Sequence, residues 1–315
     1  MLLKKRDSKC GAKITVRKRL YNSWEFWLLC LPALMYFIIF AYWPMFGAVL
    51  AFKDFNYARG ILGSDWSGFD NFKFFFLSQD AWRITRNTIG YAVTFIITGT
   101  VAAMAVALLM FEITQRKAIK TYQTILILPH FMSWVIVGYI TYILFNSEQG
   151  VFNQIITFFG GAKVDWYSNP AYWPYILPVV NIWKSVGMSS LMYYATLMGT
   201  DDSIYEAAVI DGAGRWRQTM AISVPALIPM MTILTIMSVG SIFRSDFGLF
   251  YQIPRDIGSL YPTTDVVDTY IYRGLRTGDV GITAAVGLFQ SLVGLVLVLI
   301  TNYVVKKIEP DNAMF

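Results

Sequence analysis

The sequence predicts an all-α membrane protein with six spanning helices. Its 315 residues are 56% hydrophobic and only 15% charged, whereas soluble domains average about 45–50% apolar and 25% charged residues. Six apolar stretches have about the 20 residues that a spanning helix needs. Eight of the 26 basic residues lie in the first 19 positions, directly ahead of the first apolar stretch. That distribution is typical of membrane topology and argues against a nucleic-acid surface.

The first apolar stretch defines the domain organisation. It runs without charge from Phe26 to Phe52, which is too long for the apolar part of a signal peptide, about 7–15 residues. We therefore expect a basic cytoplasmic segment at 1–25, retained by its charge or forming an interfacial helix on anionic lipid. Residues 26–315 are expected to form a single transmembrane domain. Its spans are expected at about 26–50, 88–111, 122–145, 174–199, 226–243 and 281–305.

The orientation follows from the distribution of basic residues. With the N-terminus inside, 15 Lys and Arg residues fall in the cytosolic parts and nine in the longer outer loops. This excess predicts that both termini are cytoplasmic. The cytosolic parts are then 1–25, 112–121, 200–225 and 306–315.

Two outer segments have recognisable patterns. Apolar residues recur at helical spacing from Val151 to Phe159, which predicts a short helix lying flat on the outer surface. Trp and Tyr residues surround Pro170, Pro174 and Pro178. They form either an aromatic belt at the membrane interface or a docking surface for a partner.

A polar segment at 201–225 separates two very hydrophobic stretches. Ser203 and Glu206 have capping-box spacing and predict a helix start. Gly212 predicts the end of that helix, because glycine enters the left-handed conformation without steric cost. A second helix is expected from about Arg215 to Ile222, meeting Pro225.

This segment resembles the EAA loop of ABC-type importer permeases. The pattern is present as Glu206-Ala207-Ala208, Gly212, Ile222 and Pro225, with Val224 where the family usually has Leu. The resemblance implies a type I ABC importer permease fold and a loop that docks into a cleft on a separate ATPase subunit. The coupling residues that it implies are Glu206, Ala207, Ala208, Asp211, Gly212 and Ala213.

Further segments resemble carbohydrate permeases, in particular a branch that imports oligosaccharides. They are Gly68–Phe72, Arg86–Thr88, Asp265–Tyr270 and Ala284–Ser291. The resemblance implies a multi-pass permease of the bacterial plasma (inner) membrane, working with a second, different permease subunit, two ATPase subunits and an extracellular solute-binding protein. This chain has no Gly-Lys pair, hence no P-loop. ATP and magnesium are therefore expected on the ATPase, and no cofactor on this chain.

The fourth expected span carries the charge that suggests a pathway. Lys184 is its only charged residue and shares a helix face with Asn181, and charges inside membranes are usually functional. A sugar also needs aromatic faces, which Tyr139 and Tyr142 offer one turn apart. We expect these four residues to line the substrate pathway. Lys184 is either a counter-charge for an anionic substrate or a structural partner of a carbonyl or an acid.

Two other functions agree less well with the sequence. A secondary transporter driven by an ion gradient would usually carry intramembrane acids, and the expected spans contain none. An intramembrane enzyme is disfavoured because no catalytic constellation is present. His130, the only histidine, follows Pro129 and is expected to have a structural or kink-associated role rather than to bind a metal.

Overall fold

The computed structural model describes residues 24–308, so the basic segment expected at 1–25 lies almost wholly outside the described residues. The chain divides into two units, one ending at Val49 and one beginning at Leu50. In the first unit, a π-turn comes directly before Pro44. Proline lacks the N–H for a regular helical bond, and the wider turn accommodates it. The elements are α2 (Trp24–Phe37), η1 (Ile38–Tyr42), α3 (Trp43–Met45) and η2 (Phe46–Phe52), which continues into the second unit.

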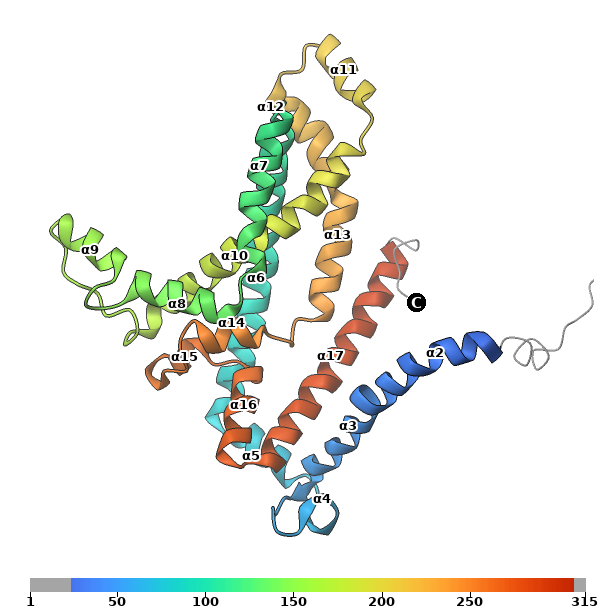
Figure 1. Cartoon of the computed structure of the whole chain (residues 1–315), viewed down its shortest axis with the longest axis vertical. Coiled ribbons are helices and arrows are strands. Elements are labelled where there is room, and N and C mark those ends of the chain that lie inside the picture. The colour runs from blue at the N-terminus through green and yellow to red at the C-terminus, as the bar shows by residue number, and fades with distance from the viewer. Residues whose placement is uncertain (1–23, 309–315) are drawn as a thin grey trace, which may run out of the picture. The chain divides into compact units, whose positions relative to one another are not determined.

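Long helices build the second unit. The 33-residue α6 is about 50 Å long, and α10 packs along it. Helix α13 packs against both α10 and α17. Figure 1 shows α11 and α12 at one end of this unit and α5 and α16 toward the other. The long helices are α6 (Gln79–Phe111), α10 (Trp173–Met198), α13 (Val224–Gly240) and α17 (Val280–Ile308).

The third expected span is sharply bent. Helix α7 (Arg116–Ile127) leads into the 3-10 turn η3 (Leu128–Phe131), and α8 (Trp134–Phe145) then leaves at an angle of 99°. Pro129 lies in η3, where its ring cannot continue a regular helix. His130 therefore lies at a kink, and this kink is much larger than an ordinary proline kink.

The six expected spans are supported only in part. Four helical segments of the described chain are long and apolar enough to cross a membrane: Trp27–Phe52, Gln79–Phe111, Arg215–Gly240 and Val280–Lys307. The bent α7–α8 pair makes a fifth if it counts as one span. Helix α10 has 26 residues and sufficient length, but Asn181, Lys184 and several serines lower its hydropathy.

Shorter elements connect the long helices. The all-α expectation needs one small correction, because Lys53 pairs with Trp66 and Asp54 with Asp65 in a two-stranded antiparallel sheet. The helix expected at 151–159 is present as α9. These elements are β1 (Lys53–Asp54), α4 (Gly60–Gly63), β2 (Asp65–Trp66), α5 (Asp70–Leu77), α9 (Val151–Phe158), η4 (Pro170–Tyr172), α11 (Asp202–Ile210), α12 (Arg215–Gln218), η5 (Thr219–Ser223), α14 (Phe247–Gln252), η6 (Gly258–Leu260), α15 (Tyr261–Thr264) and α16 (Val267–Thr277).

A buried carboxylate fixes α16 against α6. Asp265 is almost fully buried and accepts from the guanidinium groups of Arg83 and Arg273. Asn87 on α6 donates to the Asp265 carbonyl at 2.9 Å. A buried charge is tolerated only when it is paired and hydrogen-bonded. The network therefore holds the segment between α14 and α17 in one position against α6.

Candidate functional site

The EAA-type loop begins with a different cap from the one expected. Helix α11 starts at Asp202, and the Asp201 carboxylate accepts from the Ser203 backbone N–H at 3.0 Å. The expected Ser203–Glu206 capping box is therefore wrong. Three consecutive residues can each cap a helix here, and an aspartate has the further advantage of favourable charge at the N-terminus. Hydrogen bonds from Ser203 lower the pKa of Asp201.

The other end of α11 is as expected. Gly212 has a φ of +75°. The Ala213 N–H donates to the Ala208 carbonyl, and the Gly212 N–H donates to the Val209 carbonyl. These two bonds form a Schellman motif. A side chain at position 212 would strain this turn, since L-residues rarely adopt that conformation.

The second helix of the loop does not stop at Pro225. Helix α12, the π-turn η5 and α13 form one continuous helix from Arg215 to Gly240. In η5 the Val224 N–H donates to the Thr219 carbonyl, five residues earlier. This wider turn precedes Pro225, so the proline enters the helix without breaking it.

Side-chain contacts connect the loop to the long helices. The Tyr205 hydroxyl and the Ser223 hydroxyl share a 2.9 Å hydrogen bond, and the Tyr205 ring packs 5.6 Å from that of Phe111. Arg215 forms an exposed ion pair with Glu112 at 3.1 Å.

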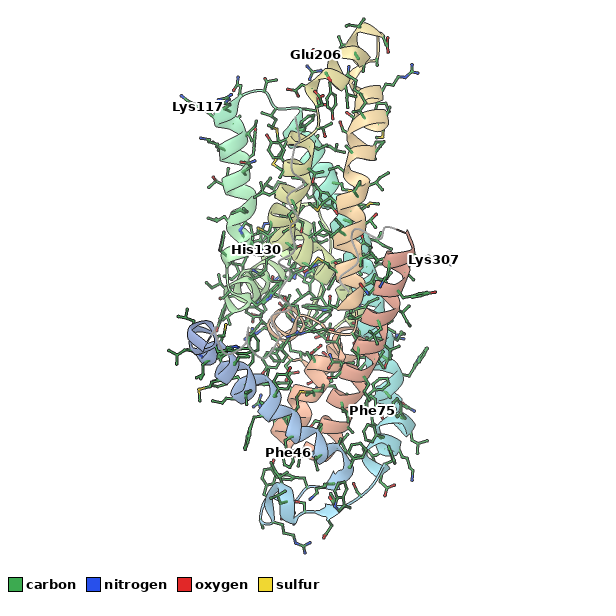
Figure 2. All side chains as sticks on the ribbon, turned by 90° about the vertical axis from the view of Figure 1, so that its right-hand side faces the viewer. Phe46, Phe75, Lys117, His130, Glu206 and Lys307 are labelled. Atoms are coloured by element: carbon green, nitrogen blue, oxygen red, sulfur yellow. The ribbon has the colours of Figure 1, made fainter. Side chains whose placement is uncertain are left out.

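Glu206 is exposed and makes no side-chain bond within the described residues. Figure 2 places it at the same end as Lys117, opposite Phe75. The exposed large apolar side chains of the loop are Ile204, Val209, Ile210, Trp216 and Met220.

The Lys184 side chain is hydrogen-bonded to backbone carbonyl groups. Its ammonium donates to the carbonyls of Pro129, His130 and Met132 at 3.3, 2.8 and 2.7 Å. Helix α10 approaches the bent segment closely at Gly187, where a Cβ atom would lie 1.9 Å from the Leu126 carbonyl oxygen. The bend leaves carbonyl groups without intrahelical partners, and Lys184 supplies the donors.

A second contact links the bend to α14. The Lys184 ammonium lies 5.0 Å from the centre of the Trp134 ring. The Trp134 indole N–H donates to Asp246 at 2.8 Å, and Asp246 caps α14 by accepting from Gly248. Lys184 therefore contacts the ring whose N–H bonds to the cap of α14.

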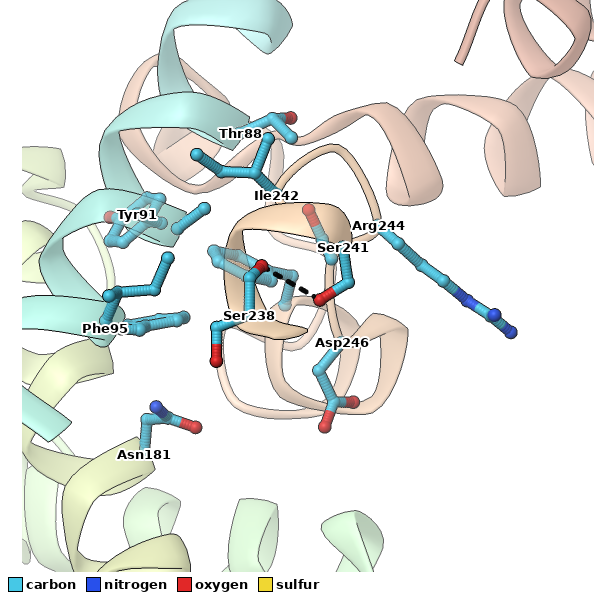
Figure 3. A pocket seen from close by; sticks show the side chains of 13 residues that line it. Thr88, Tyr91, Phe95, Asn181, Ser238, Ser241, Ile242, Arg244 and Asp246 are labelled. Atoms are coloured by element: carbon cyan, nitrogen blue, oxygen red, sulfur yellow. Dashed lines mark hydrogen bonds between the residues drawn. The ribbon is translucent and has the colours of Figure 1, made fainter. Parts of the chain in front are cut away.

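Asn181 does not join Lys184 at the bend. It lines a cavity of about 250 Å³. Figure 3 shows this Asn181 cavity, with the Arg244 side chain extending away from the other lining residues. Its polar groups include Ser238, Ser241 and Asp246. A larger cavity of about 440 Å³ shares Ser238 and Ser241 and extends along α6 and α10.

Tyr139 and Tyr142 line a separate cavity of about 250 Å³ between α8 and α14, called here the aromatic cavity. Tyr251 adds another ring, Gln252 an amide and Arg255 a guanidinium. The Arg255 guanidinium lies 4.1 Å from the centre of the Tyr142 ring. The complete lining is Val135, Gly138, Tyr139, Tyr142, Tyr251, Gln252 and Arg255.

The four expected pathway residues therefore do not share one cavity. Tyr139 and Tyr142 lie together, Asn181 lies in a different cavity, and Lys184 lines neither of these two. Sequence reasoning missed Tyr251, Gln252 and Arg255. No periodic pattern marks them, because α14 is a short helix that meets α8 only through the tertiary fold.

The chain is similar over nearly its whole length to curated permeases. It is 35% identical over 313 residues to Protein LplB of Bacillus subtilis (strain 168), covering 98% of both chains. It is also 35% identical to the polygalacturonan/rhamnogalacturonan transport system permease protein YteP of the same organism, covering 95% of this chain and 91% of the relative. No family model matches the chain.

A solved structure has the same fold. A chain of a bacterial ABC transporter involved in the import of the acidic polysaccharide alginate superposes with a TM-score of 0.85 and 32% identity, covering 93% of this chain and 99% of that chain. A second structure of a bacterial alginate ABC transporter, in complex with a periplasmic protein bound to an alginate pentasaccharide, gives a TM-score of 0.83. These similarities support an ABC permease over the secondary transporter considered above. The chain belongs to the permease subunits of carbohydrate ABC importers.

Proposed function

We propose that this chain is one of two permease subunits of an ATP-driven oligosaccharide importer in the bacterial plasma membrane. The observation that carries the proposal is the full-length similarity to a permease chain of the alginate importer, in both fold and sequence. A second permease subunit, two ATPase subunits and an extracellular solute-binding protein complete the assembly. One of the alginate transporter structures contains a periplasmic binding protein.

The EAA-type loop is proposed as the ATPase contact. Glu206 is exposed and free to pair with a basic residue on the ATPase. Ile204, Ile210 and Trp216 add exposed apolar surface at the same end, and apolar patches with a polar rim are typical of interaction sites. The Schellman turn at Gly212 sets the angle between α11 and α12. The Tyr205–Ser223 bond connects α11 to the turn before α13, so movement of the ATPase is passed to a long helix.

This proposal places the α11 end of the molecule in the cytosol, where ATP is available. The excess of basic residues in 1–25, 112–121 and 200–225 favours that orientation. Helix α9 and the segment from α14 to α16 then face the outside, where the solute-binding protein docks.

The aromatic cavity is proposed as a sugar-binding part of the pathway. Tyr139, Tyr142 and Tyr251 offer ring faces for stacking, and Gln252 offers an amide for hydroxyl groups. A carbohydrate site needs this combination of apolar faces and a few fixed polar groups. Asn181 with Ser238 and Ser241 provides a polar continuation between α10 and α13. Lys184 is proposed to keep α10, the bend and α14 in register rather than to bind sugar.

Co-purification tests the proposal. The tagged chain, expressed with the rest of its transport operon, is isolated in mild detergent, and the bound proteins are identified by mass spectrometry. We expect a P-loop ATPase in stoichiometric amount and substrate-stimulated ATP hydrolysis. Glu206→Lys should lose most of this stimulated hydrolysis. Lys73→Gln, which removes an exposed charge paired with Asp70 away from the loop, is its control and should not. Isolation of a folded permease with no ATPase under these conditions would contradict the proposal.

A further inference from the structure

Arg255 carries the one charge in the aromatic cavity that the described residues leave unpaired. Of the residues lining this cavity it alone is charged, and no carboxylate lines it. Its guanidinium makes no hydrogen bond or ion pair within the described chain. The contact it makes there is with the face of Tyr142, at 4.1 Å.

The neighbouring acid, Asp256, is paired with other groups and forms no ion pair with Arg255 in the described chain. Asp256 accepts from the Tyr261 hydroxyl at 3.0 Å and from Arg273 at 3.2 Å. Arg273 is in turn held by the buried Asp265. Both bonds end on the Asp256 Oδ1 atom, and Arg255 has no ion pair with Asp256 in the described chain, so its guanidinium remains available for an external anion.

The backbone at this point is held in an uncommon conformation. Arg255 and Asp256 have φ angles of +60° and +51°, and they are the two non-glycine residues with positive φ in the described chain. Such conformations persist only when surrounding contacts enforce them, and they concentrate at functional sites. Here the bonds to Asp256 hold the second residue of the turn, and the guanidinium of the first, Arg255, lies over Tyr142.

From these observations we propose that Arg255 makes the cavity selective for sugars that carry a carboxylate, the uronic acids. The inference rests on the proposed function, since it assigns a substrate class to the sugar site. In the empty cavity the guanidinium covers the Tyr142 face on which a sugar ring would stack. A uronate moves the guanidinium from the ring to its own carboxylate and forms a charge-assisted pair. A neutral sugar must displace the same guanidinium without that compensation, and it is therefore disfavoured.

The size of the cavity agrees with recognition of one unit at a time. Its volume of about 250 Å³ is slightly below the roughly 300–1,000 Å³ of typical small-molecule pockets. One ring of an oligosaccharide fits it, with the remaining rings outside. Each uronate unit that passes then meets the same guanidinium.

Binding measurements without the solute-binding protein test the inference. The purified importer in detergent is titrated with an alginate pentasaccharide and a galacturonate pentasaccharide, and with the carboxyl-reduced, neutral form of each. For the wild type we expect tighter binding of at least one uronate form.

In Arg255→Gln that uronate should bind about tenfold to a hundredfold more weakly, the loss expected for a charged hydrogen bond. Its neutral form should bind as well as before or better, because Tyr142 is uncovered. Arg255→Lys should keep part of the preference, and Lys73→Gln all of it.

The outcomes separate the inference from the proposed function. Equal effects of Arg255→Gln on uronate and neutral forms, or no effect on either, would overturn the role of Arg255 while the sugar site stands. Failure of all four oligosaccharides to bind the wild type would overturn both the inference and the sugar site. The ATPase co-purification described above remains an independent test of the permease function in every case.

Discussion

The Lys184 ammonium lies 2.7 Å from the Met132 carbonyl oxygen, directly after the bend between η3 and α8. Two further carbonyls, of Pro129 and His130, accept from the same ammonium. One charged side chain of α10 therefore bonds to three carbonyls at the 99° bend, and one of them, that of Pro129, also accepts from the Met132 N–H. Burial of an unpaired ammonium in an apolar region would be costly, and these three bonds offset that cost.

Replacement of Lys184 should reduce stability rather than alter sugar preference. Lys184→Met leaves the His130 and Met132 carbonyls without this donor, whereas the Pro129 carbonyl still accepts from the Met132 N–H. It should destabilise the permease by about 2–5 kcal/mol, since each buried unsatisfied group costs about 1–3 kcal/mol. Lys184→Gln keeps two donors and should be less damaging. Thermal unfolding of the detergent-solubilised importer measures the effect, with Lys120→Met on the exposed face of α7 as control. Normal thermal stability together with selective loss of anionic-sugar transport would instead make Lys184 a substrate counter-charge.

The start of α11 should depend on pH through Asp201. The pKa of this carboxyl is lowered in the folded loop by hydrogen bonds from Ser203. A lowered acid pKa means that the contribution to stability is complete above the unfolded value, about 3.9. It is lost as the pH falls through the lowered folded value. Hydrogen-exchange protection of the first turn of α11 should therefore fall below about pH 4 in the wild type.

Asp201→Asn is the matched variant for this prediction. Asparagine also caps helices but does not titrate, so its protection should remain flat over the same range. Ser203→Ala should leave the cap intact, since the bond uses the Ser203 backbone N–H. A larger loss of protection in Ser203→Ala than in Asp201→Ala would restore the Ser203 cap that the sequence suggested.

The EAA-type loop should be required for coupling but not for folding. Gly212→Val places a β-branched side chain at a φ of +75° and should distort the Schellman turn. Glu206→Lys reverses an exposed charge that has no partner in the described chain. Both variants should insert and bind sugar normally, but lose most substrate-stimulated ATP hydrolysis. Stimulated hydrolysis at the wild-type rate in both would exclude this loop as the contact.

Cysteine labelling tests the orientation. In a background lacking Cys10 and Cys30, a cysteine near Gly161, at the exposed Ala162, should react with a membrane-impermeant thiol reagent on intact cells. A cysteine at Gln218 should react only after the membrane is opened. The reverse pattern would invert the topology and remove the α11 end from the cytosol.

Much of the fold follows from local signals in the sequence. Uncharged apolar length located α10 and α17 to within three residues at each end, and Gly212 identified the end of α11. Hydropathy could not place the start of α6 at Gln79, because Asp80 and Arg83 pair with each other and extend the helix beyond its apolar part. It also could not show that a π-turn carries α12 through Pro225, since proline usually marks a helix boundary.

The site was less predictable, because its residues come together only through tertiary contacts. Tyr139 and Tyr142 could be proposed from their spacing on one helix. Their partner Arg255 could not, since it depends on α14 packing against α8 and on a left-handed turn at a non-glycine residue. For Lys184, the sequence left a structural and a functional role open. The surroundings of Lys184 depend on the bend at Pro129, and hydropathy does not predict the angle of that bend.

Transport by the purified system tests the central claim most directly. The importer is reconstituted in liposomes with its solute-binding protein, and uptake of a labelled alginate or galacturonate pentasaccharide is measured. The wild type should accumulate sugar only when ATP is supplied on the side of the ATPase subunits, and a proton or sodium gradient alone should drive nothing. Uptake driven by an ion gradient with the ATPase subunits omitted would contradict the account.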